Sequence, residues 1–122
     1  MLNENAVPCW DTTAPDGILE VWPQGFESSV AYQGTQLIEI NGNTTATVFQ
    51  DFTTYPGAEL QISFAHKGRW GNDVVRVEIG PVGGPYTSLG QFNDGNVAWV
   101  FHTLSYTVPT SGGSNYSLRF VS

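Results

Sequence analysis

The sequence predicts an all-β domain built as an antiparallel β-sandwich. Short runs rich in β-branched and aromatic residues recur along the chain, and turn residues separate them about every ten positions. No segment keeps a helical period of apolar residues. The length of 122 residues suits one domain, and 14 glycines provide turn residues for many short strands. We therefore expect one β-sandwich module over residues 1–122.

The expected strands can be placed in order by their composition and by the turn residues between them. Proline presets φ and glycine supplies positive φ in the turn 55–58, Tyr-Pro-Gly-Ala. The stretch 93–96, Asn-Asp-Gly-Asn, is a second strong turn signal. The expected strands cover residues 18–22, 36–41, 46–54, 59–66, 73–79, 86–92, 97–108 and 116–121, and the seventh is the longest.

Alternation along these runs predicts which side chains face the core. Leu60, Ile62 and Phe64 point one way in their strand, as do the apolar residues of the run 73–79. Several strands carry charged residues on the opposite face. If these strands are neighbours, one surface is lined by Glu20, Glu39, Arg76 and Glu78.

The charge of the chain argues against two classes of partner. The net charge is −7 with only four Lys and Arg residues, so the chain lacks the cations that bind nucleic-acid phosphates or anionic membrane surfaces. No apolar run is long enough to cross a bilayer. An acidic module suits divalent cations and neutral ligands, although simple solubility explains the charge equally well.

We expect Cys9 and Trp99 to be buried. The single Cys9 cannot form an intrachain disulfide, and free cysteine is among the most buried residue types. Trp99 falls within the expected strand 97–108, so we expect it in the core.

A series of motifs then resembles a known family. The motifs run in the order Val7-Pro8-Cys9-Trp10, Thr12-Thr13, Asp16-Gly17 with Glu20 and Trp22, Tyr32-Gln33-Gly34-Thr35-Gln36 with Glu39 and Asn41, Gln50-Asp51, Pro56-Gly57, and Ser63 to Arg69. Together they resemble bacterial extracellular modules related to the DUF642 type, which are galactose-binding-like jelly rolls. The resemblance covers residues 7 to about 80 well and the rest more loosely.

The resemblance implies a jelly-roll module that binds a ligand or serves as a structural unit of a surface protein or adhesin. It also implies that the module is part of a larger multi-domain chain, secreted or displayed at the cell surface. Two departures matter: no Asn-Gly-Asp/Ser-Phe-Glu strand precedes Val7, and no acidic strand closes the chain. One or two terminal strands of the full domain would then be missing, with any calcium ligands that they carry.

The expected loop 66–73 is the first candidate site. A sugar site needs groups that hydrogen-bond neighbouring hydroxyls and an aromatic face for the C–H side of the ring. Arg69 and Asp73 can supply the bonds, with His66 and Lys67 beside them, and Trp70 can supply the platform. The alternative is a structural clasp in which Arg69 pairs with Asp73 and Trp70 packs as a lid.

Two carboxylates form the second candidate site, Glu20 and Glu39, with Trp22 and Asn41 two positions on. Such a pair could serve as the acid and base of a small glycosidase. We favour a structural role, in which Glu20 and Glu39 pair with Arg76 or cap loop amides, and next to it hydrogen bonding to a ligand, because sandwiches of this size are more often binding modules than enzymes.

Calcium is the one cofactor that the sequence suggests. Asp11 and Asp16 lie in a loop rich in oxygen atoms, the ligands that calcium prefers, although the spacing is not that of an EF-hand. His66 and His102 are far apart in sequence and lack cysteine pairs, which disfavours transition metals.

The sequence therefore favours a non-catalytic module that binds carbohydrate, such as a cell-surface glycan, in a lectin-like manner. The first alternative is a structural or adhesive spacer without sugar binding, and the second is a small glycosidase. An exposed Trp70 beside free polar groups would favour the first reading, and a fully buried set of tryptophans would favour the spacer.

Overall fold

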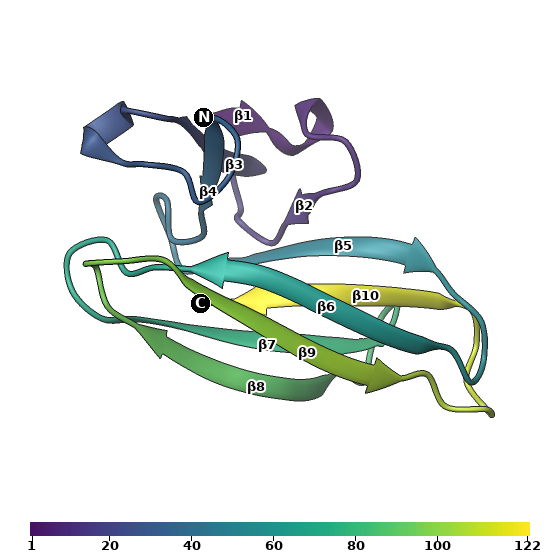
Figure 1. The fold of residues 1–122 in the computed structure, drawn as a ribbon. Helices are drawn as coiled ribbons and strands as arrows, with labels where there is room; N and C mark the ends of the chain where they lie inside the picture. The colour runs from purple at the N-terminus through teal and green to yellow at the C-terminus, as the bar shows by residue number, and fades with distance from the viewer.

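The computed structural model describes residues 1–122 and is almost entirely β (Figure 1). Two 3-10 turns, η1 (Glu4–Ala6) and η2 (Phe26–Ser28), interrupt the strands. The strands are β1 (Leu2–Asn3), β2 (Asp11–Thr12), β3 (Ile18–Pro23), β4 (Gln36–Glu39), β5 (Thr47–Thr53), β6 (Glu59–His66), β7 (Asp73–Pro81), β8 (Thr87–Asp94), β9 (Val100–Thr107) and β10 (Asn115–Val121). No helix is long and apolar enough to span a membrane.

The strands form two layers and a small third sheet, all with antiparallel pairing. One layer has the strand order β2-β5-β10-β7-β8, and the other is the pair β6-β9. The small sheet β1-β3-β4 lies above one end of this sandwich, with the connection from β6 to β7 at the same end (Figure 1). This arrangement places the N-terminal third of the chain over the sandwich edge.

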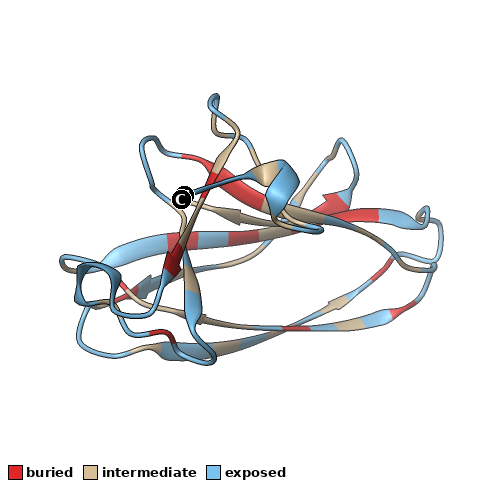
Figure 2. Ribbon diagram, turned by 90° about the horizontal axis from the view of Figure 1, so that it is seen from above, coloured by how far each residue is buried: buried red, intermediate tan, exposed pale blue.

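The core lies between the two layers, where alternation predicted it. Val75, Val77 and Ile79 are fully buried on β7, and Ile62 is buried on β6. Leu60 and Phe64 pack against the same cluster, as do Leu104 and Tyr106 of β9. Buried positions fall mainly along the strands and leave the loops exposed (Figure 2). The predicted sandwich and its core-facing residues are therefore confirmed.

The small sheet is held to the sandwich by a few apolar side chains. Leu19 and Trp22 of β3 are buried. Trp10 lies 6.1 Å from Phe120 of β10, measured between ring centroids. Few other residues are buried in this part of the chain.

Two expectations about buried residues are wrong. Cys9 is exposed and has a positive φ of 68°, because it lies in the connection between η1 and β2, outside the sandwich. Trp99 is only half-buried, because β9 begins at Val100 and Trp99 precedes it. Its indole Nε1 donates a hydrogen bond of 2.7 Å to the carbonyl of Val30, which fixes the ring against the N-terminal segment instead of in the core.

Candidate functional site

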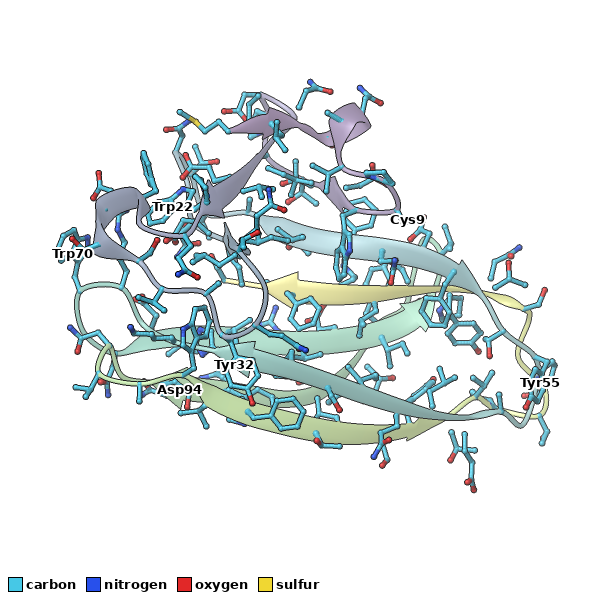
Figure 3. The ribbon with its side chains drawn as sticks, turned by 45° about the horizontal axis from the view of Figure 1, so that its top comes forward. Cys9, Trp22, Tyr32, Tyr55, Trp70 and Asp94 are labelled. Atoms are coloured by element: carbon cyan, nitrogen blue, oxygen red, sulfur yellow. The ribbon has the colours of Figure 1, made fainter.

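A cleft of about 210 Å³ lies between the small sheet and the connection from β6 to β7. Four separate segments line it: the stretch from β3 through η2 to the residues just after β4, the stretch from the end of β6 to the start of β7, Trp99 before β9, and Ser122 after β10. In Figure 3, Trp22 and Trp70 lie near each other at this end, whereas Tyr55 lies at the far end of the sandwich. Of the predicted ligand residues, the cleft is lined by Trp22, Glu39, Asn41, His66, Arg69, Trp70 and Asp73.

Arg69 is the central cation of the cleft. Its guanidinium carbon lies 4.5 Å from the centroid of the Trp22 ring and 5.1 Å from that of Trp70. Nη2 donates a hydrogen bond of 2.8 Å to Glu27 Oε2. Two aromatic faces and one carboxylate thus restrain the side chain, and its remaining N–H groups are available to a ligand.

The predicted salt bridge between Arg69 and Asp73 is wrong. Asp73 Oδ2 instead accepts a hydrogen bond of 2.8 Å from the backbone N–H of Arg69 and so closes the loop locally. The side chain of Arg69 pairs with Glu27, which no sequence pattern predicted to lie nearby. Trp70 is 79% exposed, so it does not pack as a lid.

Gly68 sets the path of this loop through close approach of backbone atoms. Neither Gly68 nor Gly71 has a positive φ, so at position 68 the lack of space for a Cβ, and not the backbone conformation, requires glycine. A Cβ on Gly68 would lie 1.9 Å from the carbonyl oxygen of Gly71 and 2.9 Å from that of Asp94. The N–H of Gly68 donates to the carbonyl of Gly95 at 3.0 Å. The loop is thus pinned to the end of β8.

Glu39 brings an unusual carboxylate into the cleft. Burial raises the pKa of Glu39, while the N–H of Asn41 and the charge of Arg69 oppose that rise, and Asp73 and Glu20 add to it. The side chain therefore takes up a proton more readily than an exposed glutamate. In either state it offers hydrogen-bonding oxygens beside Arg69.

Glu20 and Arg76 lie outside the cleft. Glu20 is directly opposite Glu39 in the β3–β4 pairing, and its Oε2 accepts a hydrogen bond of 3.2 Å from the Trp22 indole. Arg76 Nε donates to Glu78 at 2.7 Å, on β7 of the five-stranded sheet. The expected single surface of four charges is wrong, because β3 and β4 belong to a different sheet from β7.

The sequence patterns did not predict a cluster of buried Asp94 with the half-buried side chains of His66 and His102. Asp94 Oδ2 accepts hydrogen bonds from His66 Nδ1 at 2.8 Å and from His102 Nε2 at 2.7 Å. Burial alone would raise the pKa of Asp94, but the hydrogen bonds from His102 and His66 outweigh it and hold the pKa below its ordinary value. Period-two alternation could have predicted that His66 points inward, since it follows Leu60, Ile62 and Phe64 on the same face of the strand.

The aspartates assigned to calcium have other contacts or none. Asp16 Oδ1 accepts a hydrogen bond from the N–H of Ile18 at 3.1 Å, and its Oδ2 accepts one from Asn43 Nδ2 at 3.4 Å. Asp11 is exposed on β2. No group of three or more His, Cys, Asp or Glu side chains is arranged to hold a metal ion. Calcium binding through backbone carbonyls beside Asp11 and Asp16 stays a prediction.

No protein-family profile matches the chain, and no curated protein is significantly similar to it in sequence. Solved structures are similar to it in fold. A xylan-binding domain from carbohydrate-binding module family 22 has a TM-score of 0.66 at 18% identity over 98% of this chain and 80% of its own. The C-terminal family 22 module of a Clostridium thermocellum protein, studied for residues in its ligand-binding cleft, has a TM-score of 0.65 at 17% identity over the same shares.

A structure of a family 4 carbohydrate-binding module has a TM-score of 0.57 at 20% identity and covers 84% of this chain and 74% of its own. At these identities the likeness concerns the fold. It agrees with the antiparallel strands and the two packed layers described above. The chain has the jelly-roll β-sandwich fold that these carbohydrate-binding modules share.

Proposed function

We propose that this chain is a non-catalytic carbohydrate-binding module of a secreted or cell-surface protein, and that it binds its glycan in the cleft beside Trp70. One observation carries the proposal. Residues that the sequence selected as sugar ligands, from segments far apart in the chain, line one cleft together. The fold is also that of known carbohydrate-binding modules, including one described as xylan-binding.

The cleft offers the two kinds of contact that a sugar ring needs. Trp70 presents an exposed aromatic face for the C–H side of the ring. Arg69, Glu39 and Asn41 offer donors and acceptors around it. Each hydrogen bond gains only about 1 kcal/mol, because the sugar exchanges bonds to water for bonds to protein. We therefore expect weak binding to one site, strengthened when the parent protein carries several modules.

The arrangement of the carboxylates supports binding over catalysis. A glycosidase places two carboxyl groups on either side of the scissile bond. Here Glu20 and Glu39 are directly opposite each other in the β3–β4 pairing, so their side chains share one face of that sheet. Glu39 lines the cleft and Glu20 does not, and the hollow that both residues line has a volume of only about 10 Å³, enough for at most one water molecule. That hollow is too small for a sugar ring to lie between the two carboxyl groups.

A glycan-array screen with and without calcium identifies the ligand, and calorimetry of Trp70→Ala then tests the site. We expect the substitution to lower the affinity by about tenfold or more and to leave the melting temperature almost unchanged, since Trp70 is exposed. Tyr55→Ala is the matched control, because Tyr55 is 68% exposed and lies at the opposite end of the sandwich. Unchanged affinity with a sharply lower melting temperature would instead mean that Trp70 stabilises the fold and does not bind the glycan.

One contact favours the second candidate, a structural or adhesive spacer. Arg69 bonds to Glu27 and packs on Trp22, so it ties the N-terminal sheet to the sandwich. A spacer domain would need these contacts of Arg69 for its stability but would bind no ligand. A screen without any bound glycan, together with strong destabilisation of Arg69→Ala, would favour the spacer.

A further inference from the structure

A second cavity adjoins the cleft and differs from it in chemistry. Its volume is about 310 Å³, and 11 of its 14 lining residues are hydrophobic. It lies under β4, at the open end of the sandwich, where Phe64, Val75 and Phe120 reach its inner wall. Exposed residues Tyr32 and Gln36 border it toward solvent. The core therefore stays open at this end.

The cleft and the apolar cavity are adjacent. Six residues line both of them: Leu37, Ile38, Ile40, Ala65, His66 and Trp99. A ligand group in the cleft thus lies within a few side chains of the apolar cavity. A sugar alone would leave that cavity empty, because its hydroxyls lose their water there and find few partners.

Five of the 14 residues that line the cavity are aromatic. Trp10, Tyr32, Phe64, Trp99 and Phe120 all line it. The hydrogen bond from Trp99 Nε1 to Val30 fixes one ring at its edge. Tyr32 stacks on Phe101 at 6.0 Å between centroids, with 15° between the ring planes, and lies edge-on to Trp99 at 6.4 Å. The rings are thus held in place before any ligand arrives.

We propose that the glycan of this module carries an aromatic substituent, and that this ring enters the apolar cavity while the sugar lies in the polar cleft. The inference rests on the proposed function and specifies its ligand class. Aromatic rings attract one another in edge-to-face and offset geometries beyond the gain from burial alone. A cavity walled by five aromatic side chains therefore favours an aryl group over an alkyl chain of similar size.

The test compares methyl, hexyl and phenyl β-glycosides of glucose, galactose and xylose by calorimetry at millimolar concentrations. Phenyl glycosides should bind at least about tenfold more tightly than methyl glycosides of the same sugar, and more tightly than hexyl glycosides. Tyr32→Ala should reduce the gain of phenyl over methyl severalfold while methyl binding stays unchanged. Tyr55→Ala should preserve the whole gain.

Other outcomes separate the two proposals. Equal affinity for phenyl and methyl glycosides would overturn the inference and leave carbohydrate binding in place. A hexyl gain equal to or above the phenyl gain would overturn the aromatic assignment. Benzyl alcohol serves as a probe without sugar: if it binds as tightly as the phenyl glycosides, the cavity works alone and the joint site is wrong. If no methyl or phenyl glycoside binds and the glycan array is also blank, both proposals fail.

Discussion

The guanidinium of Arg69 lies over the ring of buried Trp22, 4.5 Å from its centroid. Trp22 belongs to the N-terminal sheet, and Arg69 to the connection between two sandwich strands. This contact therefore joins two parts of the chain at the floor of the cleft. It also orients the planar donor group that a sugar would meet, which a flexible side chain in open solvent would not achieve.

We expect Arg69→Lys to weaken glycan binding by roughly tenfold, about 1.4 kcal/mol, because lysine keeps the charge but loses the planar stack and the fork of donors. Stability should change by less than about 1 kcal/mol, since the ion pair with Glu27 is solvent-exposed and screened. Arg76→Lys is the matched control, because Arg76 also pairs with a glutamate but lies outside the cleft. Equal loss in both variants would contradict the assigned role.

Calcium binding at the Asp11 and Asp16 loop is tested by melting the protein with calcium and with a chelator. If the site binds, a hundredfold excess over the dissociation constant stabilises the fold by about 2.7 kcal/mol. The double variant Asp11→Asn/Asp16→Asn should abolish that gain. Identical melting curves of the unmodified protein with calcium and with chelator would show that this loop does not bind calcium.

The glycines of the 66–73 segment should respond differently to alanine. Gly68→Ala places a methyl group against two backbone carbonyls, so we expect a loss of about 1–3 kcal/mol in the free energy of unfolding and weaker glycan binding. Gly71→Ala meets no atom within 4 Å and should be tolerated. Chemical denaturation of both variants checks the contrast. Equal stability would mean that the loop relaxes around Gly68.

Local patterns predicted most of the strands, because period-two alternation is a property of each strand alone. The runs 59–66 and 73–79 matched β6 and the start of β7, including their buried faces. The same patterns failed at Trp99, where the strand begins one residue later than the tryptophan. The general preference of free cysteine for burial failed at Cys9, where burial depends on what covers the loop and not on the residue type.

The sequence predicted several of the residues that line the candidate site, but it did not predict which residues contact one another there. Chemistry alone selected Trp22, Arg69 and Trp70, and the fold brings them together. The pairing of Arg69 with Glu27 depends on where η2 lies, which no local pattern specifies. The apolar cavity forms because β4 covers one end of the sandwich, and a sequence pattern within single strands cannot predict how separate elements pack.

The cluster of Asp94, His66 and His102 should make the free energy of unfolding fall at acidic pH. Because the pKa of Asp94 is lower in the folded chain than its usual value, the ionised carboxylate stabilises the fold above about pH 4, and that contribution is lost as the pH falls through the folded value. Asp94→Asn should therefore cost about 2–3 kcal/mol at pH 6, since the two hydrogen bonds from the histidines lose the charge of their nearly buried acceptor.

At pH 3 the difference between the unmodified protein and Asp94→Asn should be smaller than at pH 6, because the carboxyl of the unfolded chain is then largely protonated while the folded chain keeps the charge only down to its lowered pKa. Urea denaturation across this pH range measures it directly. Asp51→Asn provides the control, since Asp51 is exposed on β5 and should alter the unfolding free energy little at either pH. A constant difference between pH 6 and pH 3 would show that the ionised form of Asp94 is not what the two histidines stabilise.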